Sequence, residues 1–265
     1  VPESTWAQGG AKRMWNGSGY SPFRTPFVEA VLINYAGGLA DHRSTIFRSP
    51  DKHGLAGICF GKRGDYLDVQ LMHRGFVLTN EGFGGGCSHR DTALATLAVL
   101  NSRVSQYMIN QYCGQHKGTG YVNRLPIPDT EAETTAKLAA SARRCWACAR
   151  ELQVHSEIDH GYRGPLPLEE SGYPLSLQDT VATFNKLEEA LAHAVEENDQ
   201  LVALCFGLQD EDIALVREAT SNRPVTCVSW VPGQQNNSDS LRIIAHRVFS
   251  FILGVIFGRW SSLST

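Results

Sequence analysis

Two stretches carry contrasting backbone patterns: Leu97-Ala-Val-Leu-Asn-Ser-Arg-Val-Ser-Gln-Tyr107 and, after a glycine-containing loop, Tyr121-Val-Asn-Arg-Leu-Pro-Ile-Pro128. Apolar residues recur at helical spacing in the first stretch. We therefore expect a helix that begins near Ser88 or Asp91 and runs to about Tyr112. The alternating prolines of the second stretch favour an extended, edge-like conformation that excludes a helix.

The chain upstream of this pair is rich in strand-forming residues. Three short β-type runs are separated by turn residues and predict a meander: Leu55–Phe60, Tyr66–Met72 and Phe76–Thr79. The first fifty residues are rich in Gly, Ser and Pro, and we expect irregular structure there around one strand, Val28–Tyr35.

The chain downstream is mostly helical in pattern. Thr130 and Glu133 form a plausible capping box for a long helix that ends near Val154. A proline-rich linker of residues 165–174 follows. Three further helices are expected, at Ser176–Glu197, Asp199–Phe206 and Asp210–Ala219, then a β-like run at Val225–Trp230 and a final apolar helix near 248–257.

Together these patterns predict the α+β class. A small mixed or antiparallel sheet with a supporting helix would occupy residues 1–128, and a mostly helical region would occupy residues 129–265. The chain has 265 residues with 42% hydrophobic residues, which is enough for one large or two small domains.

Charge and cysteine content limit the class of protein. The net charge of −3 and the pI of about 6.3 provide no overall basic signature, so nucleic-acid binding must depend on local features. The seven cysteines are an odd number, scattered mostly through apolar segments, and we see no signal peptide. A reducing, cytoplasmic location is the prediction.

The apolar run from Val248 to Phe257 is the one membrane candidate. Basic residues at Arg242, His246, Arg247 and Arg259 enclose it at roughly half of the ~20 residues that a spanning helix needs. A buried helix of a non-membrane protein is therefore the better interpretation.

No catalytic or metal motif stands out. Gly82-Phe-Gly-Gly-Gly86 resembles a phosphate loop only in its glycines, so a hinge or turn is the simpler interpretation. Cys145-Trp-Ala-Cys148 lacks a second ligand pair for zinc, and Cys87 with His89 is no stronger, so packing and loop roles are expected. The chain carries no signature of nucleophilic catalysis.

What remains is a set of cations and amides on predicted turns and loops. Cations on turns can reach phosphates, while Arg and Asn can reach base edges. By themselves these residues are also consistent with an ordinary solvated surface. The candidate DNA-binding residues are Lys62, Arg63, Arg74, Arg103, Lys117, Asn123 and Arg124.

The ordered pair of stretches quoted above resembles the target-recognition region of type I and type IIG restriction-modification proteins. A later segment of these methyltransferases is similar to Leu201-Val-Ala-Leu-Cys-Phe-Gly-Leu-Gln-Asp-Glu-Asp212. A helix of large BREX and DISARM phage-defence methyltransferases is similar to Val248-Phe-Ser-Phe-Ile-Leu-Gly-Val-Ile-Phe-Gly-Arg-Trp260.

The resemblance implies S-adenosylmethionine-dependent methylation of adenine N6 in duplex DNA, with the target base rotated out of the stack. The family's Gly-rich cofactor motif and its Asn-Pro-Pro-Tyr/Phe motif are absent from this sequence. We therefore expect a fragment or subunit that chooses the DNA sequence. Its partners would be double-stranded DNA, a methyltransferase catalytic domain that binds the cofactor, and other defence-system subunits.

Within this resemblance, Lys62, Arg63 and Lys117 would grip phosphates, and Arg103, Asn123 or Arg124 would contribute base or phosphate contacts. The alternative is a protein-interaction subunit of a defence complex without direct DNA contact. In that case the helical region would dock a partner and the basic turns would only be solvated.

Overall fold

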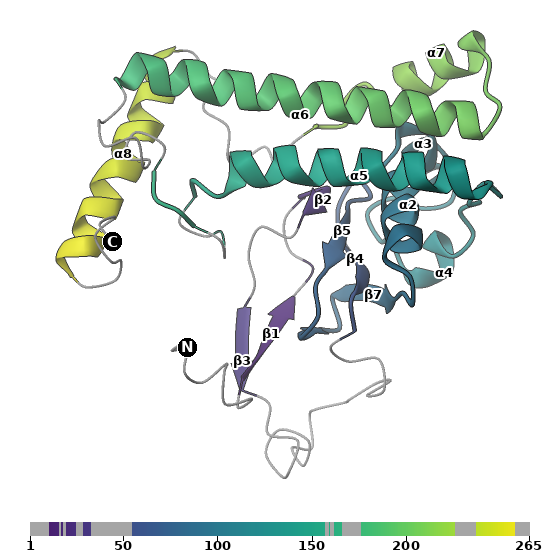
Figure 1. Ribbon diagram of the computed structural model, residues 1–265, viewed down its shortest axis with the longest axis horizontal. Coiled ribbons are helices and arrows are strands. Elements are labelled where there is room, and N and C mark those ends of the chain that lie inside the picture. Colours follow the sequence, from purple (N-terminus) through teal and green to yellow (C-terminus); the bar gives the residue numbers. More distant parts are fainter. Residues whose placement is uncertain are drawn as a thin grey trace.

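The structure is a computed structural model, and it describes residues 11–15, 17, 20–24, 29–32, 55–156, 159, 162–165, 176–225 and 237–257. In this part of the chain two small sheets lie beside a layer of helices (Figure 1). The coarse α+β class is therefore confirmed. The finer expectation of a target-recognition fold stays a prediction.

The larger sheet has four strands in the order β2-β5-β4-β7: Phe23–Arg24, Val69–Met72, Gly57–Gly61 and Gly82–Gly86. The β2–β5 pair is parallel and the other two pairs are antiparallel. The predicted pairing of the first two runs of the meander is confirmed by β4 and β5.

The smaller sheet has three strands in the order β3-β1-β6: Glu29–Leu32, Ala11–Trp15 and Phe76–Leu78. The third run of the expected meander, β6, thus leaves β5 and pairs parallel to β1. The expectation of a single strand in the first fifty residues was wrong, because β1 and β2 lie there in addition to β3. A small apolar cluster, separate from the main core, consists of residues from both sheets: Trp15, Cys59, Met72 and Phe76.

Gly82–Gly86, expected as a loop or hinge, is the strand β7. Close packing requires two of its glycines, Gly82 and Gly84, whereas a Cβ at Gly85 would have no atom within 4 Å. A Cβ at Gly82 would lie 2.7 Å from the Trp15 ring, and one at Gly84 would lie 2.6 Å from the carbonyl oxygen of Ile58. The glycines therefore serve strand packing, which an interpretation of the local sequence as a flexible loop could not anticipate.

The helix expected up to Tyr112 is two helices, α2 at Arg90–Leu100 and α3 at Arg103–Asn110. Ser102 caps the second helix and accepts a hydrogen bond from the Ser105 backbone N–H at 3.2 Å. The chain turns at this point because a Ser side chain replaces the missing helical partner of that amide.

The stretch Tyr121–Pro128 is only partly extended. A short helix, α4 at Thr119–Val122, enters it, and regular structure stops before Pro126. The proline pattern thus excluded a helix from its second half and not from its beginning.

The long helix α5 spans Ala132–Gln153. The predicted capping box is wrong, because the N-cap is Glu131 and no side chain caps the helix start. Thr130 instead forms a hydrogen bond with Thr135, and Glu133 pairs with Lys137 at 2.7 Å.

Helix α6 spans Leu177–Cys205, where two helices were expected, and begins at the Ser176 cap. It stays continuous because the side chains of Asn198 and Asp199 form hydrogen bonds with residues of other elements. Asn198 donates to the Ala98 carbonyl at 3.0 Å and accepts from Ser141 at 2.9 Å. Helix α7 at Asp210–Ala219 has the predicted bounds.

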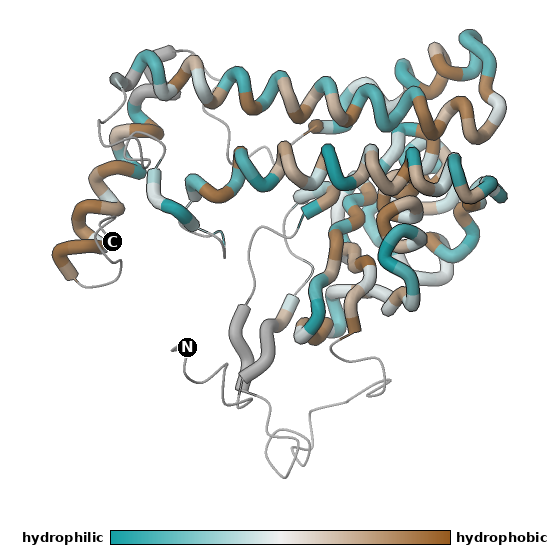
Figure 2. The backbone as a smooth tube through the Cα atoms, in the orientation of Figure 1, coloured by the Kyte–Doolittle hydropathy of each residue, from teal (hydrophilic) through white to brown (hydrophobic). Residues whose placement is uncertain are grey.

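The last helix, α8, spans Asn237–Ile256 and begins earlier than the apolar run that predicted it. Its second half is predominantly hydrophobic in Figure 2, and the expectation of a buried helix was wrong for most of it, because Phe249, Ile252 and Ile256 are 44–69% exposed. In the described part of the chain, the helices lack the combination of length and apolar content that membrane crossing requires. The β-like run predicted from 225 to 230 lies almost wholly outside the described residues.

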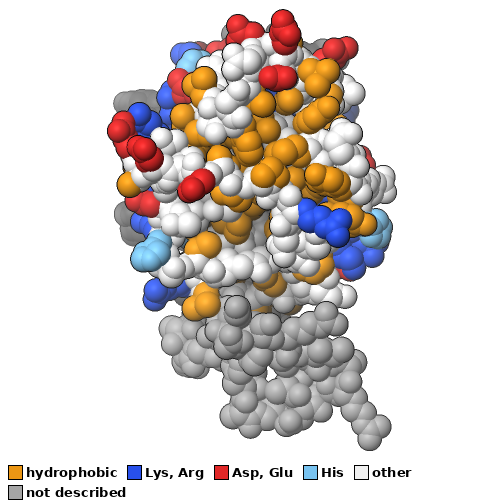
Figure 3. All heavy atoms as spheres, turned by 90° about the vertical axis from the view of Figure 1, so that its right-hand side faces the viewer, with side chains coloured by type: hydrophobic (Ala, Val, Ile, Leu, Met, Phe, Trp, Pro, Cys, Tyr) orange, Lys and Arg blue, Asp and Glu red, His pale blue; other side chains and the backbone are white. Residues whose placement is uncertain are grey.

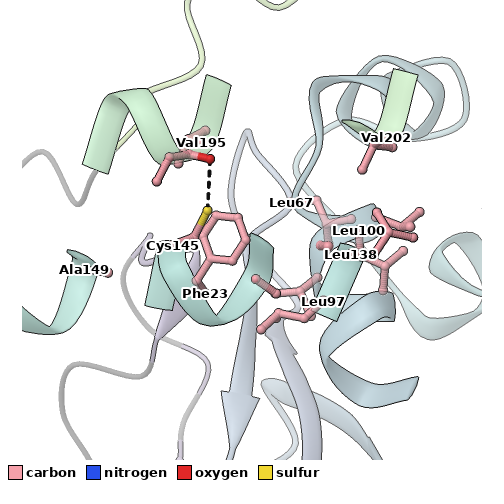
Figure 4. Close-up of a cluster of buried hydrophobic side chains, with 14 of the residues drawn as sticks. Phe23, Leu67, Leu97, Leu100, Leu138, Cys145, Ala149, Val195 and Val202 are labelled. Atoms are coloured by element: carbon pink, nitrogen blue, oxygen red, sulfur yellow. Dashed lines mark hydrogen bonds between the residues drawn. The ribbon is translucent and has the colours of Figure 1, made fainter. Parts of the chain in front are cut away.

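The core lies around α5, which packs against α2 on one side and α6 on the other (Figure 1). One apolar cluster includes Phe23 of the sheet, Leu97 of α2, Leu138 of α5 and Val202 of α6 (Figure 4). The Cys145 thiol donates to the Ala194 carbonyl at 3.3 Å and joins α5 to α6. Residues on both sides of the expected boundary at residue 128 thus contribute to one core.

Candidate functional site

The junction between α2 and α3 is held against the sheet by Asn101. Its Oδ1 accepts from the Val69 backbone N–H at 3.0 Å, and its Nδ2 donates to the Val69 carbonyl at 2.7 Å. On α3, Gln106 accepts from the Leu67 backbone N–H at 2.7 Å. The stretch that carries the family resemblance therefore acts here as an anchor between helix and strand.

The β4–β5 turn lies against a loop that is distant in sequence. Arg63 forms an antiparallel bridge with His116, and the Lys117 backbone N–H donates to the Lys62 carbonyl at 2.8 Å. Gly64 donates to the Gln115 carbonyl at 3.0 Å. The β4–β5 turn, which carries Lys62 and Arg63, is thus joined to the loop that carries Lys117.

Lys117 has a structural position in this pair of loops. Its side chain is 1% exposed, and Nζ donates to the carbonyls of Gly64 at 2.6 Å and Gly114 at 2.9 Å. Burial lowers the pKa of Lys117. Its ammonium therefore holds the two loops together and does not face solvent beside the other cations.

Lys62 and Arg63 share one carboxylate. Arg63 Nε donates to Glu81 at 2.8 Å, and Lys62 Nζ lies 3.7 Å from the same side chain. The Arg63 side chain is still 66% exposed. Exposed ion pairs of this kind contribute roughly 0–1 kcal/mol, so a phosphate can compete with Glu81 for the guanidinium.

Asn123 and Arg124 lie just after α4, on the continuation of the loop that carries Lys117, and both are exposed. Their backbone N–H groups donate to Thr119 and Tyr121, which gives them a defined turn. They therefore lie within seven residues of Lys117 along the chain.

The remaining two candidates lie elsewhere. Arg74 is exposed at the opposite end of β5, where its neighbour His73 contacts Trp146 at a ring separation of 6.1 Å. Arg103 faces inward, with Nε 3.3 Å from Asp199 and Nη1 donating to the Thr220 carbonyl at 2.8 Å. The structure therefore brings together Lys62, Arg63 and Lys117 and separates Arg74 and Arg103 from them.

A buried polar network was missed by the sequence analysis. Asp68 accepts from the Ser21 backbone N–H at 2.8 Å and from the Gln70 side chain at 3.0 Å. Burial raises the pKa of Asp68 to about 7, although these hydrogen bonds lower it. The only signal in the sequence was a carboxylate inside the β-type run from 66 to 72.

The network continues through Tyr20 and Arg223. Arg223 Nε donates to the Tyr20 hydroxyl at 3.2 Å, and that hydroxyl donates to the Pro224 carbonyl at 2.8 Å. Burial raises the pKa of Tyr20, while the Arg223 charge lowers it. Burial also raises the pKa of Asp199, against the opposing effect of Arg223.

A buried ion pair between Arg24 and Asp159 joins the N-terminal strand region to the end of α5. The Arg24 guanidinium contacts the Asp159 carboxylate through both of its terminal nitrogens, one of them at 2.7 Å. It also donates to Gln153 at 2.7 Å. These polar groups fix tertiary packing and are not arranged around a reacting atom.

The cysteine pairs show no ligand geometry. Among the residues that the structure describes, no group of three or more His, Cys, Asp or Glu side chains could hold a metal ion. Cys145 is buried and burial raises its pKa, while Cys148 is half-buried. Since the glycine-rich segment Gly82–Gly86 is the strand β7, we assign none of the described residues to S-adenosylmethionine.

Neither of the two comparisons with known proteins identifies a relative. No family model matches the chain, and no curated protein matches it.

Proposed function

We propose that this chain recognises duplex DNA for an S-adenosylmethionine-dependent adenine N6 methyltransferase, whose catalytic motifs are absent from this sequence. One observation carries the proposal: the β4–β5 turn presents the exposed Arg63 and the partly exposed Lys62, and it is fixed by backbone pairing with the loop before α4 and by the buried Lys117 of that loop. The resemblance of the flanking stretches supplies the class of methyltransferase.

In this proposal Lys62 and Arg63 bind phosphates after exchanging Glu81 for a phosphate oxygen. Arg124 adds a further cation, and Asn123 supplies an amide of the kind that reads adenine in the major groove. Catalysis and rotation of the target base would belong to the partner domain. Lys117 serves as a positioning residue that keeps the two loops in register.

Arg74 fits as a separate phosphate contact. It lies beyond the far end of β5, a strand that rises about 13 Å over its four residues. A duplex lying along the strand would place phosphates near both ends. Arg103 is left out of the DNA-binding residues, because it is engaged with Asp199 and Thr220.

The test is binding of the chain to random-sequence duplex DNA over a range of salt concentrations. We expect salt-sensitive binding. The Arg63→Ala/Arg124→Ala variant should lower the slope of log affinity against log salt by about 0.9 for each phosphate that it no longer neutralises. Arg144→Ala is the control, since Arg144 is also exposed but lies on α5 and pairs with Glu197.

Absence of binding at low salt would overturn the proposal. So would an equal loss of affinity in the Arg144→Ala variant, because that would show attraction to charge in general. In either case the protein-interaction subunit without DNA contact would be the better account.

A further inference from the structure

Glu81 lies between β6 and β7, beside the β4–β5 turn that carries Lys62 and Arg63. Its carboxylate accepts a hydrogen bond from Arg63 Nε at 2.8 Å and lies 3.7 Å from Lys62 Nζ. One acidic side chain thus pairs with both of the cations on this turn.

The backbone of Glu81 is fixed independently of its side chain. Its carbonyl accepts from the Lys62 backbone N–H at 2.9 Å, and its own N–H donates to the Thr79 hydroxyl at 3.3 Å. Gly17 packs so closely that a Cβ on it would lie 2.4 Å from the Glu81 carbonyl oxygen. The carboxylate therefore extends from an anchored turn, and an amide in its place should leave that turn intact.

The three side chains are accessible to an anion from solvent. Their exposed fractions are 33% for Lys62, 66% for Arg63 and 30% for Glu81. A carboxylate and a DNA phosphate each carry one negative charge, and both accept hydrogen bonds from guanidinium and ammonium groups. A phosphate that reaches the two cations therefore competes with Glu81 for them.

The charge of this turn matters because the rest of the surface adds little attraction for DNA. The net charge of the chain is −3. Among the described residues on the face in Figure 3, acidic and basic side chains are scattered around a largely apolar centre, without an extended basic patch. Neutralising one of two neighbouring cations is then a large change in the local attraction for phosphates.

We propose that Glu81 is an internal competitor of DNA phosphates and sets how tightly the β4–β5 turn holds duplex DNA. In the free chain its carboxylate neutralises part of the charge of Lys62 and Arg63. A bound duplex displaces that carboxylate and leaves it unpaired beside a phosphate, so each bound phosphate is held more weakly than by the two cations alone. This inference rests on the function proposed above and concerns the regulation of the same site.

The test compares binding of the full chain and of its Glu81→Gln variant to a labelled random-sequence duplex, by fluorescence anisotropy at two salt concentrations. The variant should bind about three- to tenfold more tightly at low salt, and by a smaller factor at high salt, because ions screen exposed charges. Glu197→Gln is the matched control. Glu197 also pairs with two basic side chains, Arg144 and His193, but it lies on α6, so its replacement should leave the affinity unchanged.

A second comparison separates competition for the cations from general repulsion of DNA. In the Arg63→Ala background, Glu81→Gln should raise the affinity by about twofold or less, because only Lys62 is left to be released. General repulsion between a carboxylate and DNA would not depend on Arg63. Urea unfolding of each variant establishes that it is folded, and a merely structural Glu81 would lower stability without raising affinity when replaced.

Three results would overturn the inference: unchanged affinity of the Glu81→Gln variant, an equal gain with Glu197→Gln, or a gain that persists in full with Arg63→Ala. In each of these cases the unaltered chain still binds DNA, and the proposed function stands. Failure of both the unaltered chain and the Glu81→Gln variant to bind DNA would overturn the proposed function together with this inference.

Discussion

Asn101 and Val69 are joined by a reciprocal pair of hydrogen bonds across the helix–sheet boundary: the Asn101 amide accepts from the Val69 N–H at 3.0 Å and donates to the Val69 carbonyl at 2.7 Å. Both residues are buried. The side chain therefore acts as a short piece of β-strand that extends the ladder of β5 to the α2–α3 junction.

Replacing Asn101 with Ala should destabilise the fold strongly. It leaves the buried N–H and carbonyl of Val69 without partners, at about 1–3 kcal/mol for each group. Urea unfolding measures the change. Asn123→Ala is the control, because Asn123 is exposed and its replacement should change the free energy of unfolding by less than about 0.5 kcal/mol. Equal effects of the two substitutions would contradict the anchoring role.

The protein should lose stability as the pH rises from about 4 to about 7. The pKa of Asp68 is about 7 in the fold, above its value in an unfolded chain, so the folded state binds the proton more tightly. The stabilisation is complete below the unfolded pKa and is lost as the pH passes through the folded pKa.

Asp68→Asn should flatten this pH dependence, by roughly 2–4 kcal/mol between pH 4 and 8. Unfolding measured at several pH values in both proteins gives the difference. A variant whose stability falls as steeply as that of the parent would assign the pH dependence to other groups, such as Asp199.

Lys117→Met should destabilise the protein, whereas Arg63→Ala should change its stability little. The buried Lys117 ammonium donates to two carbonyls that would lose their partner, at about 1–3 kcal/mol each. Arg63 forms only an exposed ion pair, with an expected contribution of roughly 0–1 kcal/mol. Thermal unfolding of both variants checks the contrast, and the reverse order would show that Lys117 is not a structural residue.

Asp159→Ala should cost about 3–5 kcal/mol, because it leaves the buried Arg24 guanidinium without its counter-charge. Arg24→Met/Asp159→Leu should be less harmful than the single substitution, since it removes both charges and keeps apolar volume. Chemical denaturation of the single and double variants tests this. A double variant that is less stable than the single one would show that the pair contributes more than mutual neutralisation.

The sequence by itself was sufficient for features that depend on local preference. Helix α7 has its predicted bounds, Ser176 begins α6 as expected, and β4 and β5 lie within the predicted runs or extend them by one residue. Periodicity and capping determine such elements, because the interactions that stabilise them lie within a few residues. The exposed cations on the 61–65 turn were also visible in the sequence.

Other features of the fold depend on tertiary contacts between residues that lie far apart in the chain. Gly82–Gly86 is a strand since Trp15 and β4 pack closely against it, and α6 continues through Asn198 since Ala98 and Ser141 satisfy that side chain. Lys117 and Arg63 have similar chemistry in the sequence, yet one is buried and the other exposed. Long-range packing and hydrogen bonding, which no local pattern encodes, set which polar groups remain on the surface.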